Sequence, residues 1–281
     1  MDNNLILKRF FSKPILHDLL SGKTNDVFEC VVRRYISDPE GKSYSELVSE
    51  IYTYLGKNYR TEYFYKNTML NKLLIKRHDY TKTIVLSELP IGNSKADFIM
   101  INGKGVVYEI KTELDNLERL NSQIRDYYKA FSEVVIVTYE ENLDKVKKII
   151  PDTVGIMLLT KRKALKMVRD PLPNFSFLDY KTIFKILRKY EFEDIIQSKA
   201  YSLPEVNQFQ YYRECYSIIT QINIEELQVA MLKALKKRMK IEIVEFTMSL
   251  PEELRFLSYF DDNILKYEKT AYCELSRSYG G

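Results

Sequence analysis

The sequence predicts an α/β protein in which helices flank a mixed β-sheet. Continuous apolar runs rich in branched residues occupy 98–101, 106–110, 133–138 and 154–159, which is typical of buried strands. Helical periodicity fills the segments before, between and after these runs. The order of strands and helices favours one α/β core over separate all-α and all-β units.

Three regions follow from this pattern. Residues 60–160 contain the sheet-building core, and residues 1–59 and 161–281 read as helical N-terminal and C-terminal regions. The boundary near 160 is marked by three basic residues and the linker-like segment 170–174. The N-terminal helices suit either a helix-turn-helix-like appendage or a bracket packed on the core.

The composition excludes several classes of protein. Hydrophobic residues make up 45% of the 281 residues, enough for a sizeable core, and the net charge of +4 permits nucleic-acid binding without requiring it. Three scattered cysteines exclude a zinc ribbon and a disulfide framework. The start MDNNLILKRFF has no secretory pattern and no apolar run reaches 18 residues. We therefore expect a soluble, cytoplasmic protein that does not insert into a membrane.

The stretch that carries chemistry is a predicted β-hairpin between Asp97 and Lys111. The turn 102–105 is rich in glycine, and alternation of side chains places Glu109 and Lys111 on one face of the second strand. If the turn is centred on Gly103, Asp97 lies opposite Glu109. If it is centred half a step later, Asp97 opposes Ile110 and points away, unless a bulge corrects the register.

Two carboxylates and a lysine inside an apolar sheet require a partner. Charged side chains are rarely buried unless they are paired or bind a metal, and two adjacent carboxylates raise each other's pKa. Oxygen ligands from Asp97 and Glu109, with the Ile110 carbonyl, suit Mg²⁺ or Mn²⁺. Lys111 would then lie where it can orient a water activated by the metal and offset charge on a phosphate.

This arrangement resembles the PD-(D/E)XK nuclease superfamily, through Asp97, Glu109 and Lys111. Gln123 and Tyr127 form a Gln-x3-Tyr on the following helix, as in the RecB-type exonuclease branch. A closer likeness, to a little-studied bacterial and phage group, covers about a third of the chain. It includes Glu62 (EYFYKNTMLNKLL), Glu88, Glu109-Ile-Lys-Thr, Asp115 and Gly155-Ile-Met-Leu-Leu. Ala96 replaces the leading proline of the motif, as in many members.

The resemblance implies a restriction-endonuclease-like fold and places further acidic residues near the site. Glu62 begins a helix expected over 61–76 and would approach the metal, although an acidic residue in a first helical turn is also favoured by the helix dipole. Glu88 lies late in a strand expected over 83–89. It would be a third carboxylate near the metal or would orient a ligand, and the alternative is an exposed strand end.

The helix after the hairpin is expected to span about 113–131 and to bury Leu114. In the family, the residues corresponding to Gln123 and Tyr127 contact the DNA backbone or the site water. The alternative is a surface amide beside a half-buried tyrosine. Arg119 is a candidate phosphate contact.

The resulting hypothesis is a metal-dependent DNA nuclease that hydrolyses phosphodiester bonds. The alternative is a protein of nuclease fold that is silent, or that awaits a protein partner on its helical C-terminal half, in phage–host conflict. The segment 232–240 (LKALKKRMK) carries five positive charges and would either follow a phosphate backbone or form a solvated helix face.

Overall fold

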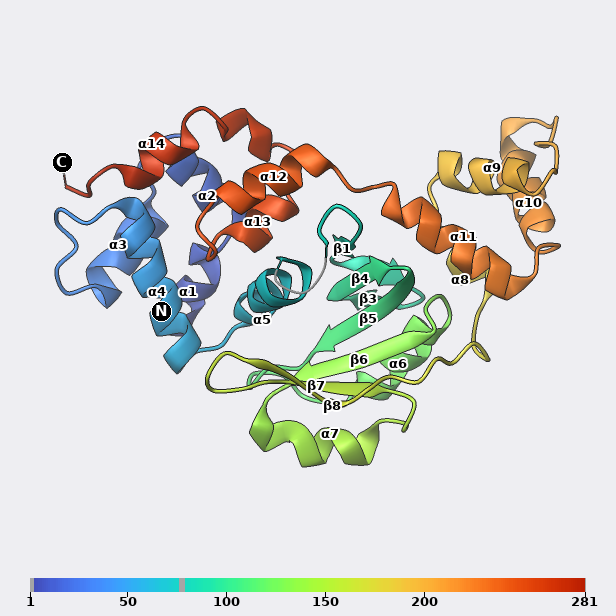
Figure 1. The fold of residues 1–281 in the computed structure, drawn as a ribbon, viewed down its shortest axis with the longest axis horizontal. Helices are drawn as coiled ribbons and strands as arrows, with labels where there is room; N and C mark the ends of the chain where they lie inside the picture. The colour runs from blue at the N-terminus through green and yellow to red at the C-terminus, as the bar shows by residue number, and fades with distance from the viewer. Residues whose placement is uncertain (1–2, 76–78, 281) are drawn as a thin grey trace.

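A six-stranded mixed sheet, ordered β1-β4-β5-β6-β7-β8, forms the centre of the computed structural model, which describes residues 3–75 and 79–280 (Figure 1). Its strands are β1 (Ile84–Leu86), β4 (Phe98–Asn102), β5 (Lys104–Ile110), β6 (Glu133–Thr138), β7 (Gly155–Leu159) and β8 (Leu165–Arg169). Strands β5, β6 and β7 run parallel, and the other pairings are antiparallel. A small second sheet pairs β2 (Leu89–Ile91) with β3 (Ser94–Ala96). This confirms the expected mixed sheet with flanking helices and helical terminal regions.

The hairpin of β4 and β5 turns at Gly103. Asn102 pairs with Lys104 and Phe98 with Tyr108, so the register continues to bring Asp97 opposite Glu109. Gly103 has a φ of +76°, a conformation that glycine adopts without steric cost. Of the two registers considered from the sequence, the structure has the one in which both carboxylates share a face.

The strand expected over 83–89 is interrupted. β1 ends at Leu86, and Glu88 lies in a tight connection to β2 with a φ of +58°. A residue with a side chain rarely adopts such a φ, and its cost is tolerated where surrounding contacts fix the chain. Glu88 is therefore in a turn, where the sequence had placed it in a strand.

Two further expectations need correction. The helix expected over 113–131 is shorter: α6 spans Leu120–Tyr128, and Leu114 is 50% exposed. The backbone N–H and hydroxyl of Thr112 both donate to Asp115, and such a local turn competes with a helix. The sheet also continues past residue 160 into β8, an edge strand whose alternating exposed residues gave no clear apolar run.

The terminal regions form two helical groups on opposite sides of the sheet. The first contains α1 (Asn3–Phe10), α2 (Lys13–Leu20), α3 (Asp26–Tyr35), α4 (Tyr44–Asn58) and α5 (Glu62–Met69), the last continued by a π-helical segment, Leu70–Ile75. The C-terminal helices α12 (Ile241–Ser249), α13 (Arg255–Tyr259) and α14 (Ala271–Ser276), with a 3-10 turn at Ile264–Tyr267, return to the same group. The expected helix over 61–76 is thus present to Ile75, and Lys76 lies outside the described residues.

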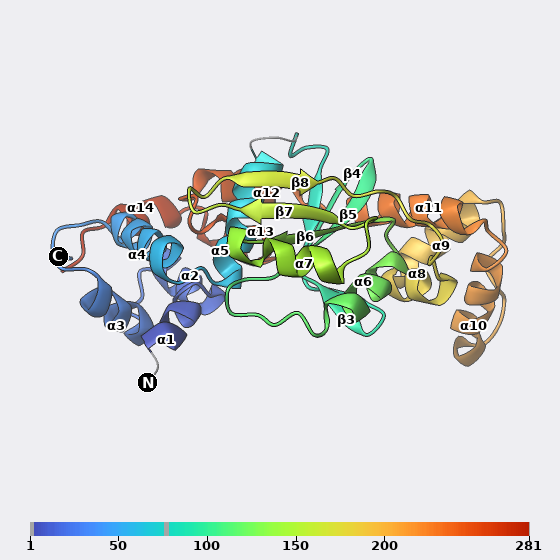
Figure 2. The same cartoon turned by 90° about the horizontal axis from the view of Figure 1, so that it is seen from below.

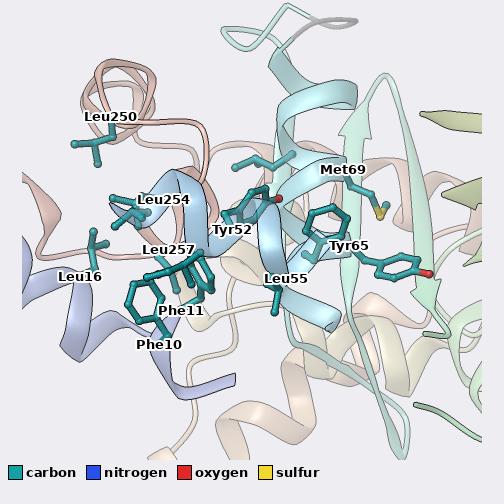
Figure 3. Packing of buried hydrophobic residues seen from close by; sticks show 14 of the residues in the cluster. Phe10, Phe11, Leu16, Tyr52, Leu55, Tyr65, Met69, Leu250, Leu254 and Leu257 are labelled. Atoms are coloured by element: carbon teal, nitrogen blue, oxygen red, sulfur yellow. The ribbon is translucent and has the colours of Figure 1, made fainter. Parts of the chain in front are cut away.

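These helices share one hydrophobic core with a face of the sheet. Figure 3 shows Phe10, Phe11, Tyr52, Leu254 and Leu257 packed together although they come from both ends of the chain. The same cluster includes Tyr108 and Ile110 of β5. The N-terminal helices therefore pack against the sheet and the returning C-terminus.

The second group covers the opposite face of the sheet, seen from below in Figure 2. It comprises α6, α7 (Leu143–Ile149), α8 (Tyr180–Ile186), α9 (Lys189–Ser198), α10 (Gln208–Ile219) and α11 (Ile224–Lys236), with a 3-10 turn at Glu140–Asn142. Alternate residues of β5 and β6, such as Val107 and Ile136, point into this cluster. The region 161–281 therefore divides between the two groups. No helix among the described residues is long and apolar enough to cross a bilayer.

Candidate functional site

The candidate site lies at the end of β5, where helices from both faces of the sheet meet. α6 approaches from one face and α5 from the other. Asp97 is the single residue between β3 and β4, at the point where the chain leaves the small sheet for the large one. Its Oδ2 accepts the backbone N–H of Ile110 at 2.8 Å, and the Ser87 hydroxyl donates to its carbonyl at 2.7 Å. The position of Asp97 is thus fixed by a backbone N–H of β5 and by the hydroxyl of Ser87, which directly follows β1.

Glu109 lies in a closed network of hydrogen bonds. Lys111 Nζ donates to its Oε1 at 2.8 Å, the Gln123 amide donates to the same oxygen, and the Tyr127 hydroxyl donates to Oε2. The Gln123 amide oxygen accepts from Lys111 Nζ at 3.0 Å, so this amide bridges both charged groups. Glu109 is 1% exposed and Tyr127 is fully buried. The sequence-predicted Gln123 and Tyr127 therefore contact Glu109 directly and hold it in place.

The network leaves Glu109 some capacity to bind a metal. An ionised carboxylate offers about four lone-pair positions, and three donors occupy Glu109 here. Backbone N–H and C=O groups of one extended residue point the same way, so the Ile110 carbonyl faces the side of Asp97, to which its N–H donates. The predicted ligand set of Asp97, Glu109 and Ile110 thus lies together at one end of the strand.

A second set of carboxylates lies on the open side of Asp97. Ligand oxygens of Glu62, Glu88 and Asp97 all lie within 4.8 Å of one another. Glu62 begins α5, and its side chain is 53% exposed. The side chain of Glu88 is 50% exposed. Hard oxygen donors at this spacing suit Mg²⁺ or Mn²⁺.

Lys66 belongs to this cluster, although the sequence analysis did not select it. It follows Glu62 by one helical turn, and its Nζ pairs with both Glu62 and Glu88. Its side chain is only 6% exposed. Burial alone would lower the pKa of Lys66, but the two carboxylates outweigh it and raise that pKa. The sequence does contain a sign of this contact, because Glu62 and Lys66 are four residues apart on one helix and such pairs lie side by side.

The electrostatics of the cluster centre on Asp97. Burial, followed by repulsion from Glu109 and Glu62, raises the pKa of Asp97 to about 8, against the opposing effects of the Ile110 N–H and Lys66. The pKa of Glu88 is lowered, because Lys66 and Lys95 outweigh its burial. A cation beside Asp97 would offset the repulsion from Glu109 and Glu62 that contributes to this raised pKa.

One side of the cluster borders a cavity of about 360 Å³. Glu62 and Lys66 line it, with Thr112 from the end of β5 and the aromatic side chains of Phe11 and Phe256 from the helical group. This volume lies at the lower end of the range for small-ligand sites. Glu62 is accordingly reachable from this cavity, whereas Glu88 lines a different cavity beside β1.

Two sequence-predicted contacts lie elsewhere. Arg119 is exposed at the start of α6, and its role as a phosphate contact stays a prediction. The basic segment 232–240 is largely paired: Lys237 with Asp194, Arg238 with Glu191, and Lys240 with Asp262. All three basic residues follow the end of α11 at Lys236, and the side chain of Arg238 is only 12% exposed, so this part of the segment is not the solvated helix face considered from the sequence. Whether the segment follows a phosphate backbone stays a prediction.

Comparison with known proteins places the chain in a family. The family model of bacteriophage P4 protein cII matches residues 56–258, a span that contains every residue of the candidate site. The chain belongs to the bacteriophage P4 cII family. The curated protein cII of Enterobacteria phage P4 is 22% identical over 176 residues, which is 59% of this chain and 63% of that relative. The match therefore spans less than two thirds of the relative's length.

Among solved structures, a protein of unknown function from Silicibacter pomeroyi is similar over 47% of this chain and 86% of its own. Its TM-score is 0.32 and its sequence identity 12%. This similarity is too low to support an inference about fold or function.

Proposed function

We propose that this member of the P4 cII family is a metal-dependent DNA nuclease with a restriction-endonuclease-like core of the PD-(D/E)XK type. The observation that carries the proposal is the placement of Lys111. It lies beside Glu109, with Asp97 opposite in the hairpin register and Glu62 and Glu88 on the open side. Such an enzyme would act in the cytoplasm of a bacterial or phage-infected cell.

The residues fit a hard divalent cation, because ligand oxygens of Glu62 and Glu88 lie close to Asp97. Burial, followed by the negative charge of Glu109 and Glu62, raises the pKa of Asp97, and a cation would offset that charge. Asp97, Glu109 and the Ile110 carbonyl would hold Mg²⁺ or Mn²⁺, with Glu62 and Glu88 on the open side. When bound, the ion would polarise the phosphodiester and lower the pKa of water.

The chain's own residues would supply positioning and charge. Lys111, fixed by Glu109 and Gln123, presents an ammonium group beside the carboxylates, where negative charge builds on a phosphate during hydrolysis. Gln123 and Tyr127 fix the orientation of Glu109, and Tyr127 also donates to the Lys95 carbonyl at 3.1 Å. A rigid set of groups of this kind lowers the cost of organising the site during the reaction.

The test is cleavage of linear duplex, circular duplex and single-stranded DNA in Mg²⁺, Mn²⁺ and EDTA. We expect metal-dependent cleavage by the wild type and a loss of about 10²–10³-fold in Lys111→Ala. Lys104→Ala is the matched control, because Lys104 pairs with Glu133 at the other end of the same strand. Its cleavage rate should remain within about twofold of the wild type. Equal activity of Lys111→Ala and the wild type would refute the assigned role.

A second candidate is a nuclease fold that acts only when a protein partner binds. It is favoured by apolar side chains on α10, where Phe209 is 99% exposed and Tyr212 53%. Metal binding without cleavage of any of the three substrates would support this candidate over the first.

A further inference from the structure

A second cavity adjoins the candidate site. Its volume is about 600 Å³, and it is formed by the link between α4 and α5, the loop after β5 and the turn between β7 and β8. Leu114 lines this cavity and also the cavity that contains Glu62 and Lys66. The two cavities are thus neighbours with Leu114 in the wall of both.

The second cavity concentrates positive charge. Five cationic side chains and one carboxylate, Glu113, line it, although the whole 281-residue chain has a net charge of only +4. The cationic residues are Lys57, Arg60, Lys161, Arg162 and Lys163. They come from two segments far apart in the sequence, so the tertiary structure assembles them. We refer to this cavity as the basic cavity.

Three of these cationic side chains interact with other groups of the protein. Arg60 pairs with Glu113 and donates to the Leu159 carbonyl at 3.1 Å, and Lys161 pairs with Glu141 at 2.7 Å. The Lys163 ammonium lies 5.5 Å from the centre of the Phe64 ring, a cation–π distance. These contacts orient three of the five cationic side chains of the basic cavity. The other two are left to interact with a ligand.

Lys57 and Arg162 differ from the other three cations because their side chains are not paired within the part of the chain that the structure describes. Both are exposed, and neither side chain has a hydrogen-bond or ion-pair partner among residues 3–75 and 79–280. They come from distant parts of the chain: Lys57 lies at the end of α4, and Arg162 lies in the β7–β8 turn. A flexible ammonium and a forked guanidinium in one groove are suited to successive phosphates.

We infer that the basic cavity binds the phosphodiester backbone of a nucleic acid that extends from the candidate site, with Lys57 and Arg162 contacting phosphates. The inference rests on the proposed nuclease function and adds to it the place where the substrate lies. Phosphate contacts by cations release counterions, so they strengthen binding without selecting a base sequence. The site would accordingly hold its substrate with little dependence on sequence.

The test measures binding of a fluorescein-labelled 20-nucleotide single strand and the corresponding duplex in EDTA, so that no cleavage occurs. The form that the wild type binds more tightly is then titrated against Lys57→Gln/Arg162→Gln at several salt concentrations. We expect binding about 10- to 30-fold weaker at 0.1 M salt, and a salt dependence reduced by about 0.7–0.9 per lost contact.

The matched control is Lys181→Gln/Lys185→Gln, which removes two exposed positive charges from α8 at the other end of the molecule (Figure 1). Its affinity should stay within about twofold of the wild type, since distant exposed charges are screened. Equal effects of the two double variants, or no effect of either, would overturn the assignment of the basic cavity. Failure of the wild type to bind or cleave any nucleic acid would instead refute the proposed function itself.

Discussion

The two sets of carboxylates in the candidate site differ in how they are neutralised. Glu109 is 1% exposed and receives hydrogen bonds from Lys111, Gln123 and Tyr127. Glu62 and Glu88 are half exposed and share one ammonium, that of Lys66, while Glu88 also pairs with the exposed Lys95 at 3.4 Å. The buried carboxylate is therefore positioned before any ligand arrives, whereas the open pair can rearrange around one. This difference separates a carboxylate whose orientation is fixed in advance from carboxylates that can reorient around a metal.

The largest expected effect separates the two sets by stability. Glu109→Ala leaves Lys111, with a side chain only 11% exposed, without its carboxylate, and should cost about 3–5 kcal/mol of unfolding free energy. Glu62→Ala removes a half-exposed partner and should cost less than about 1 kcal/mol. Urea unfolding in EDTA measures both. Equal losses of unfolding free energy in the two variants would mean that the buried Glu109 and the half-exposed Glu62 do not differ in their contribution to the fold.

The next effect concerns pH. The pKa of Asp97 is raised from 3.8 to about 8, so the folded state retains a proton that the unfolded state has lost. The associated stability is fully present below about pH 4 and is lost as pH rises through about 8. Asp97→Asn keeps an oxygen for the Ile110 N–H and cannot ionise. In metal-free buffer at pH 9 it should be more stable than the wild type by about 2 kcal/mol, because the partly exposed site is screened.

Comparison of the two proteins below the unfolded pKa of 3.8, where Asp97 is largely neutral in both the folded and the unfolded state, provides the control for this experiment. Their unfolding free energies should be nearly equal there. A loss of several kcal/mol in Asp97→Asn at both pH values would show that the carboxyl group is a structural hydrogen-bonding partner.

The smallest expected effect concerns Lys66, the only cation that pairs with both Glu62 and Glu88 among the described residues. Its ammonium repels a divalent ion at the open carboxylates, so Lys66→Met should bind Mn²⁺ about tenfold more tightly than the wild type. Titration calorimetry measures the affinity, and Lys66→Arg, which retains the charge, should resemble the wild type. Weaker binding in Lys66→Met would mean that Lys66 organises the carboxylates for the metal.

Much of the hydrogen-bond network around Glu109 could be predicted from the sequence, because it depends on local periodicity. The glycine-rich turn predicted the hairpin but left two registers open, and the structure has the one centred on Gly103. Alternation along β5 put Glu109 and Lys111 on one face, and helical spacing paired Gln123 with Tyr127. The shortened α6 was missed because the Thr112–Asp115 turn competes with the helix. β8 was missed because an edge strand with alternating exposed residues lacks the apolar run of a central strand.

The sequence alone determined the mixed sheet, the hairpin and the faces of its strands, because these follow from the order of apolar and polar residues along a few neighbouring positions. Tertiary structure decided what surrounds Asp97. Packing of α5 against the sheet brings Lys66 to Glu88, and the β7–β8 turn brings Arg162 to the cavity that Lys57 also lines. Such contacts join segments with no local pattern in common, since they depend on how whole elements bury their apolar faces against one another.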